Sequence, residues 1–295
     1  MIFLILSVLS STTIMVIFKY FDRFKVQTFD AIVINYFIAG GLSIFLDSSG
    51  ISFNESHNQP WFWNAIIIGV LFITLFNVIG ISTQKIGVSV TTVANKMSLI
   101  VPVLFAVFVL GDSLNAMKIF GIVLALIAVY MTSRTVKRDD VDSKYAYYPL
   151  IVFLASGFID SFFKYNETFT LGDNGLQPFI SWIFITAFFV GMIALSIKYF
   201  KTKQLPNKRA LLGGIALGIP NYFSVFFLIK SLSIKTMQSS VVFPVNNMSI
   251  VALSALAGIF LFHEKITKIN KIGIALCLVA IALIAFSDEL MGIIA

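Results

Sequence analysis

The sequence predicts an all-α integral membrane protein with ten transmembrane helices. Of its 295 residues, 58% are hydrophobic and only 12% are charged, whereas soluble domains carry about 25% charged residues. The mean hydropathy is +0.95. Long apolar runs recur along the whole chain, and because one span uses about 20 residues, ten spans take up roughly two thirds of the length. The remainder suffices only for short loops.

The ten spans are placed by the breaks between apolar runs, which hold charges or turn residues. They cover residues 2–20, 30–46, 61–83, 88–111, 115–133, 147–165, 177–199, 210–230, 236–262 and 270–287. The first run lacks a basic start and a small-residue cleavage site, so we interpret it as a span rather than a signal peptide. A charged linker at 133–144 divides the chain into two predicted halves, 1–135 and 145–295.

Basic residues predict the orientation, because Lys and Arg in short loops are retained on the cytoplasmic side. One set of loops holds 16 of them: Lys19, Arg23, Lys25, Lys85, Arg134, Lys137, Arg138, Lys144, Lys198, Lys201, Lys203, Lys208, Arg209, Lys265, Lys268 and Lys271. The opposite set holds Lys118, Lys164, Lys230 and Lys235. We therefore expect a multi-pass protein of the plasma (inner) membrane with both termini outside the cytoplasm. The net charge of +7 then reflects orientation, not nucleic-acid binding.

The two halves share short matching segments in the same order. These are Phe18-Lys19-Tyr20 with Phe163-Lys164-Tyr165, Asn95-Lys96-Met97-Ser98 with Asn246-Asn247-Met248-Ser249, Asp112 with Glu264, and Gly121 with Gly273. Because each half has five spans, the second copy crosses the membrane in the opposite direction to the first. Inverted repeats of this kind commonly place a substrate site near the bilayer midplane and work by alternating access.

These segments also carry a family resemblance. Gly111-Asp112-Ser113-Leu114 followed by Gly121, and His263-Glu264-Lys265-Ile266 followed by Gly273, resemble the acidic turn and glycine-starting helix of the EamA-like family in the drug/metabolite transporter superfamily. The resemblance implies a ten-helix transporter of small metabolites such as amino acids. Two features depart from the family. Its members often have a proline in each of the fourth and ninth spans, but Pro102 and Pro244 are not at matching positions relative to Asp112 and Glu264. Its members also usually keep both termini in the cytoplasm, whereas the basic residues here predict both termini outside.

Two charged residues lie inside predicted spans. Lys96 lies about two turns into its span, where a charge costs at least a few kcal/mol. It is expected either to contact an anionic or zwitterionic substrate or to extend its ammonium to the cytoplasmic surface. Asp160 is the only carboxylate well inside a span. It could pair with Lys96 or carry a coupling proton, or it could lie near a wet helix end.

Polar uncharged residues supply the remaining candidates for substrate binding. Asn95, Asn246, Asn247 and Ser249 form the repeated polar cluster, and they either bind substrate or hydrogen-bond neighbouring helices. Asn77, and Asn221 after Pro220, are further candidates because a proline frees a backbone carbonyl. Weaker candidates are Asn35, Gln84, Tyr222 and Trp182, since aromatic residues near span ends are more often interfacial anchors.

Other functional classes are disfavoured by missing motifs. The sequence has no His-Glu-x-x-His, its only cysteine, Cys277, has no histidine nearby, and Asp160 has no second intramembrane carboxylate. We expect no enzyme activity, metal or cofactor. The favoured function is secondary transport of an amino acid or other zwitterionic or anionic solute, with the lipid bilayer, that solute and a coupling proton as partners. Export of lipophilic cations anchored by Asp160, or a channel or membrane scaffold, remain the alternatives.

Overall fold

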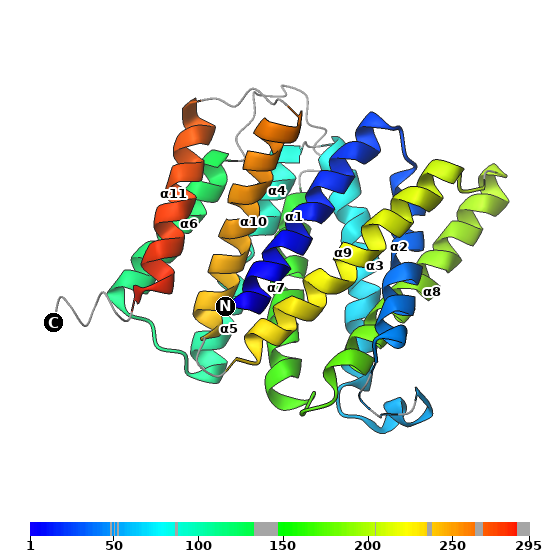
Figure 1. Ribbon diagram of the computed structural model, residues 1–295, viewed down its shortest axis with the longest axis horizontal. Coiled ribbons are helices and arrows are strands. Elements are labelled where there is room, and N and C mark those ends of the chain that lie inside the picture. The colour runs from blue at the N-terminus through cyan, green and yellow to red at the C-terminus, as the bar shows by residue number, and fades with distance from the viewer. Residues whose placement is uncertain are drawn as a thin grey trace. The chain divides into compact units, whose positions relative to one another are not determined.

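The computed structural model describes residues 1–47, 49, 51, 53–85, 88–132, 147–203, 205–234, 238–262 and 268–287, and every regular element in these ranges is a helix (Figure 1). In chain order the helices are α1 (Ile2–Arg23), α2 (Thr28–Phe45), the 3₁₀-helix η1 (Phe53–Asn58), α3 (Phe62–Lys85), α4 (Val88–Met97), α5 (Ile100–Leu110), α6 (Ala116–Thr132), α7 (Tyr148–Phe169), α8 (Leu176–Thr202), α9 (Lys208–Leu232), α10 (Ser239–Phe262) and α11 (Lys268–Ala285).

Six helices in the described part of the chain are long and apolar enough to cross a membrane: α1, α2, α3, α8, α9 and α10. Shorter apolar stretches cover Ala94–Leu110, Ala116–Met131 and Lys271–Ala285. The prediction of an all-helical, multi-pass membrane protein is therefore confirmed, whereas the count of ten spans stays a prediction. Helix α7 is not among the six, and it carries the charged residues Asp160, Lys164 and Glu167.

The predicted span 88–111 is wrong as a single helix, because the structure divides it into α4 and α5. Pro102 has no N–H to donate to the carbonyl of Ser98, so the α-helical bond between them cannot form. Val101 N–H instead donates to Ser98 O at 2.9 Å, and Ser98 Oγ donates to Asn95 O at 2.5 Å. The break therefore follows directly after the polar pair Asn95-Lys96. Pro244 lies early in α10, which continues through it.

The chain forms two compact units, and each unit combines segments of both predicted halves. Unit 1 comprises Met1–Asn77 and Phe162–Ser233, and unit 2 comprises Val78–Ser161 and Ile234–Ala295. Two of the three boundaries between the units fall within α3 and α7, and the third follows the end of α9. The two compact units therefore do not coincide with the predicted halves 1–135 and 145–295. That these halves are related repeats stays a prediction.

Glycines set the closest helix contacts of unit 1. A methyl group at Gly214 of α9 would lie 2.5 Å from Cβ of Ile34 on α2, and one at Gly218 would lie 2.6 Å from Cβ of Ile38. On α3, a methyl group at Gly69 would lie 2.6 Å from Cβ of Thr186 on α8. Small residues at such positions let helix backbones approach closely in lipid, where burial of apolar surface does not drive association.

The two ends of α9 contact different helices of unit 1. At its start, Arg209 Nη1 donates to Phe24 O at 3.0 Å, just after α1 ends. At its end, Lys164 Nζ of α7 donates to Leu232 O at 3.1 Å. A helix of this length extends on the order of 35 Å. The last turns of α1 and α7, which hold Lys19 and Lys164, therefore lie at opposite ends of α9.

Unit 2 is built around the packing of α6 against α11 and of α10 against both, and Figure 1 shows α6 and α11 side by side. Its apolar core includes Leu99, Val103, Met248 and the buried free thiol of Cys277. The acidic turn of the sequence motif has a structural role here, since Asp112 Oδ2 accepts the backbone N–H of Ser240 at 2.9 Å. This carboxylate caps the first turn of α10, as acidic residues do at helix N-termini. Glu264, its counterpart in the motif, lies outside the described residues.

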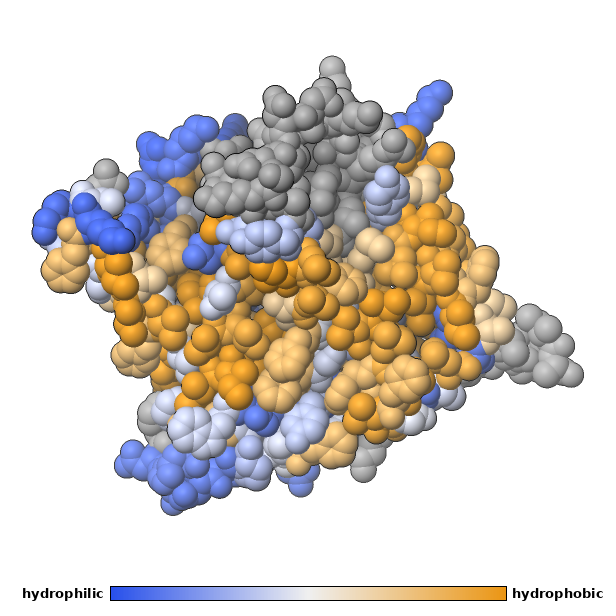
Figure 2. All heavy atoms as spheres, turned by 180° about the vertical axis from the view of Figure 1, so that it is seen from behind, coloured by the Kyte–Doolittle hydropathy of each residue, from blue (hydrophilic) through white to orange (hydrophobic). Residues whose placement is uncertain are grey.

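The surface is that of a protein in lipid. Figure 2 shows large areas of hydrophobic side chains, with hydrophilic side chains gathered in patches beyond them. Exposed aromatic residues include Phe45 at 83%, Phe108 at 81% and Phe260 at 73% exposure. In water such side chains would be unfavourable, whereas hydrocarbon solvates them.

The glycine contacts of unit 1 can be tested by substitution. Gly214→Ala would force its new methyl group into the Cβ of Ile34, and we expect a loss of about 1 to 3 kcal/mol of stability from overpacking. Gly41→Ala is the matched control, because nothing lies within 4 Å of a methyl group at Gly41 on α2. Thermal unfolding of the purified protein should show a lower midpoint for Gly214→Ala only. Equal midpoints for the two variants would contradict the close packing of α2 and α9.

Candidate functional site

The side chain of Lys96 is buried in unit 2. It is the penultimate residue of α4, only 9% of it is exposed, and its Nζ donates to Asn247 Oδ1 of α10 at 3.3 Å. The sequence left open whether the ammonium contacts a partner or extends to the surface. In the structure it is directed to an amide oxygen within the protein. Within the described part of the chain, this leaves the ammonium with capacity for two further hydrogen bonds.

Asn95 and Asp160 bring α7 to the same region of unit 2. Asn95 Nδ2 donates to Ser156 Oγ at 2.8 Å. Asp160 lies one helical turn after Ser156, is half-buried, and interacts electrostatically with Lys96. Helices α4, α7 and α10 therefore contribute one ammonium, one carboxylate, two amides and one hydroxyl. We call Asn95, Lys96, Ser156, Asp160 and Asn247 the Lys96 cluster.

Ser156 was missed by the sequence reasoning, although a signal for it exists. The spacing Ser156-x-x-x-Asp160 places a hydroxyl on the same helix face as the one carboxylate well inside a span. A search for polar residues one turn from Asp160 would have found it.

Asn246 and Ser249 lie beside Asn247 on α10. Asn246 is buried, and its Oδ1 has no hydrogen-bond partner within the described part of the chain. Ser249 is half-buried. A buried amide oxygen without a partner costs about 1 to 3 kcal/mol. The oxygen of Asn246 is therefore a position at which a ligand N–H group or a water molecule would be stabilising.

Asn77 and Asn221 belong to unit 1 and not to the Lys96 cluster. Asn77 is exposed. Asn221 is buried on α9, and its Nδ2 donates to Asn35 Oδ1 of α2 at 3.0 Å, while Asn35 Nδ2 donates to Ile32 O at 3.3 Å. Asn221 thus hydrogen-bonds a neighbouring helix of unit 1, which is the structural one of the two roles that the sequence left open for such amides. Asn35, a weaker candidate in the sequence, is its partner in this contact.

The Lys96 cluster has the chemistry of a site for a charged organic solute. Its ammonium suits a carboxylate, and its carboxylate and amide oxygens suit an amino group. Among the described residues there is no group of three His, Cys, Asp or Glu side chains that could hold a metal ion. The cluster's two amides, one hydroxyl, one ammonium and single carboxylate are likewise unlike the ligand sets of transition metals.

Comparisons with known proteins cover nearly the whole chain. The model of the EamA-like transporter family matches residues 1–134 and 168–286. An uncharacterized protein from Haemophilus influenzae is 27% identical over 298 residues, covering 98% of this chain and 99% of that protein. A solved crystal structure superposes with a TM-score of 0.80 at 15% identity, covering 98% of this chain and 97% of the other. At this identity, the last comparison speaks for the fold alone.

The contact between Asn95 and Ser156 can be tested with a double-mutant cycle. Because each side chain satisfies the other, Asn95→Ala and Ser156→Ala should lower stability by less in combination than the two single effects added. We expect a coupling free energy of about 0.6 to 1.7 kcal/mol, as for other hydrogen bonds between membrane helices. Unfolding midpoints of the four proteins give this value. A control cycle combines Asn95→Ala with Tyr147→Phe, at an exposed position just before α7. The effects of these two substitutions on stability should simply add.

Proposed function

This chain belongs to the EamA-like transporter family, part of the drug/metabolite transporter superfamily, and on that premise we propose that it moves an amino acid or another zwitterionic or anionic solute by alternating access. The observation that carries the proposal is the buried ammonium of Lys96, held by Asn247 beside the break between α4 and α5. A buried charge in a membrane helix is costly, and such residues commonly serve substrate or ion pathways.

In the proposed bound state, Lys96 attracts the carboxylate of the solute. The oxygen of Asn246 is available to an N–H group, and Asp160 supplies the negative charge that an amino group would meet. Asp160 is also the proposed carrier of a coupling proton, because it is a carboxylate within an apolar helix whose charge interacts with that of Lys96. Asn95 acts through Ser156 as a positioning residue for the end of α4.

We propose that the two halves are inverted five-helix repeats within ten spans, and the glycine contacts of unit 1 support this. Gly69 and Gly214 are 145 residues apart, as are Lys19 and Lys164. A methyl group at Gly69 would approach atoms of Ile183 and Thr186. One at Gly214 would approach atoms of Ala31 and Ile34. Those two pairs are each 152 residues apart. Equivalent residues thus make equivalent contacts between α3 and α8 and between α9 and α2.

The charge of Lys96 is the first point to test in transport. Lys96→Met keeps most of the bulk of the side chain and removes the ammonium, so uptake or efflux of the solute should fall at least about tenfold, equivalent to about 1.4 kcal/mol. Lys96→Arg keeps the charge but changes its hydrogen-bond geometry, and should be intermediate. Transport in proteoliposomes at matched protein content gives the three rates.

Lys201→Met, at an exposed position near the end of α8, is the matched control and should transport as the unaltered protein does. Full activity in Lys96→Met would contradict the proposal. It would favour instead a cation exporter that uses Asp160, in which Asp160→Asn abolishes transport of quaternary ammonium compounds. Absence of solute-selective flux in the unaltered protein would favour a channel or scaffold.

Orientation is a separate prediction. From the basic residues we propose that the protein lies in the plasma (inner) membrane with both termini outside and the linker 133–144 inside the cytoplasm. In a Cys277→Ala background, Ile2→Cys should react with a membrane-impermeant thiol reagent in intact cells, and Ser143→Cys should react only after permeabilisation. The reverse labelling pattern would show that the family's usual orientation holds here as well.

A further inference from the structure

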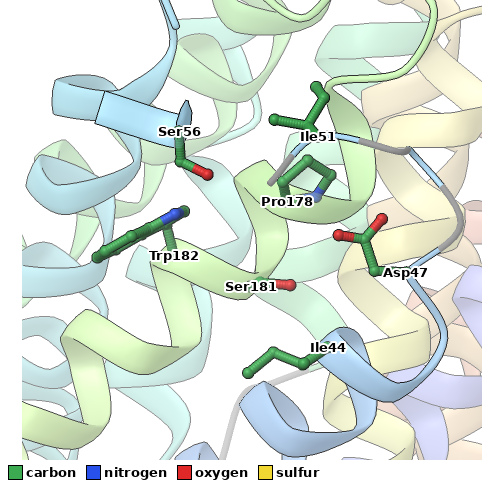
Figure 3. Close-up of a pocket in the computed structure, with 7 residues that line it drawn as sticks. All are labelled: Ile44, Asp47, Ile51, Ser56, Pro178, Ser181 and Trp182. Carbon is green, nitrogen blue, oxygen red and sulfur yellow. The ribbon is translucent and has the colours of Figure 1, made fainter. Parts of the chain in front are cut away.

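Unit 1 contains a pocket that has no part in the Lys96 cluster. Its volume is about 300 Å³, and its lining consists of Ile44, Asp47, Ile51, Ser56, Pro178, Ser181 and Trp182 (Figure 3). The pocket lies where α2 ends and α8 begins, next to η1. Two contacts fix this geometry. Gln177 Nε2 donates to Leu46 O at 2.7 Å, and the hydroxyls of Ser43 and Ser181 share a hydrogen bond of 2.7 Å.

The pocket has a negative electrostatic character. Asp47 is the only ionisable group among the seven lining residues, and within the described part of the chain it forms no ion pair with a basic side chain. Its Oδ1 accepts the N–H of Ser49 at 2.8 Å, which holds the carboxylate in place. The C-terminal end of α2 adds the partial negative charge of unpaired carbonyl groups. A cation is therefore favoured over an anion at this position.

An aromatic ring and two hydroxyls complete the lining. Figure 3 shows Trp182 and Asp47 on opposite sides of the pocket, with Ser181 between them and Ser56 above. Trp182 is fixed by an edge-to-face contact with Phe62, with ring centroids 4.8 Å apart. Figure 3 draws the Trp182 ring nearly edge-on, with its nitrogen-bearing edge toward the pocket. The ring edge supplies an apolar wall on which the alkyl groups of an alkylammonium can pack, and Asp47 opposite supplies the counter-charge.

The basic residues of unit 1 are concentrated at the other end of α2. Asp30, in its first turn, forms an ion pair of 2.6 Å with Lys198 of α8. The 18 residues of α2 separate this pair from the pocket by about 27 Å. Two basic residues lie at the pocket end of α9. Lys164 is paired with Glu167, and the Nζ of Lys230 lies over the rings of Phe3 and Phe226. A cation can thus approach Asp47 without strong repulsion.

We propose that this pocket is a binding site for a small organic cation of the alkylammonium class, with Asp47 as its counter-charge and Trp182 as its aromatic wall. A volume of about 300 Å³ is at the lower limit of ligand pockets and exceeds what a bare metal cation fills. The site is independent of solute binding at the Lys96 cluster, since its lining lies entirely in unit 1. On the proposed orientation it opens on the outer side of the membrane.

The experiment measures binding of tetramethylammonium to the purified full-length protein by calorimetry and by the shift of the unfolding midpoint. Sodium chloride at the same ionic strength, and acetate as an anion, are the reference salts. We expect saturable stabilisation by tetramethylammonium only. Asp47→Asn and Trp182→Leu should each weaken binding at least about tenfold, whereas Asp173→Asn, an exposed carboxylate in the loop before α8, should leave it unchanged.

Equal stabilisation by sodium and tetramethylammonium would overturn the proposal, as would unaltered affinity in Asp47→Asn or in Trp182→Leu. If one of these two variants fails to fold, the proposal is still tested by the other variant and by comparing tetramethylammonium with the reference salts on the unaltered protein. Lys96→Met separates this inference from the proposed function, because it should lose transport and bind tetramethylammonium normally. Loss of tetramethylammonium binding in Lys96→Met would place the cation at the Lys96 cluster and overturn the pocket site.

Discussion

Polar groups inside a bilayer must be satisfied by the protein itself, and most of this structure can be understood from that constraint. Hydrocarbon offers no hydrogen bonds, so the backbone is helical wherever it is apolar, and each buried side-chain amide, hydroxyl or charge needs a partner. Where Pro102 removes a helical bond, the carbonyl of Ser98 is taken up by Val101 and the hydroxyl of Ser98 bonds to Asn95. The helix breaks without leaving these groups unpaired.

The same constraint separates structural from functional polar residues. Asn221 and Asn35 bond to one another and need no ligand. In the Lys96 cluster the balance is different, because an ammonium with three donors meets one amide oxygen at hydrogen-bond distance among the described residues. Asn246, which precedes the cluster's Asn247 on α10, has a buried oxygen without a described partner. Other buried atoms, such as Tyr36 Oη and Trp61 Nε1, also lack a hydrogen-bond partner among the described residues, so the Lys96 cluster is distinguished by its buried ammonium, whose charge a solute carboxylate would complement.

Close helix packing is the second consequence of the lipid environment. Since lipid tails solvate apolar side chains as well as another helix does, association depends on van der Waals contact and on small residues at the interface. Gly69, Gly214 and Gly218 provide it in unit 1, and Gly121 against Ile284 provides it in unit 2. The pocket near Asp47 lies at a helix end, where packing is looser and polar residues are tolerated. The two polar sites differ in charge, because the Lys96 cluster holds both an ammonium and a carboxylate, whereas Asp47 is the only ionisable group that lines the pocket.

The sequence by itself determined the helical class, nearly all helix positions, the family, and Lys96 and Asp160 as charged residues inside apolar segments, because hydropathy and charge are properties of a local stretch of chain. Only the tertiary structure decided which of those residues meet. It paired Asn95 with Ser156 and Lys96 with Asn247, assigned Asn221 to a separate contact, divided 88–111 into two helices, and brought Asp47 opposite Trp182. Near-uniformly apolar helices carry almost no periodicity that would tell which face packs inward, so partners far apart in the chain are fixed by packing alone.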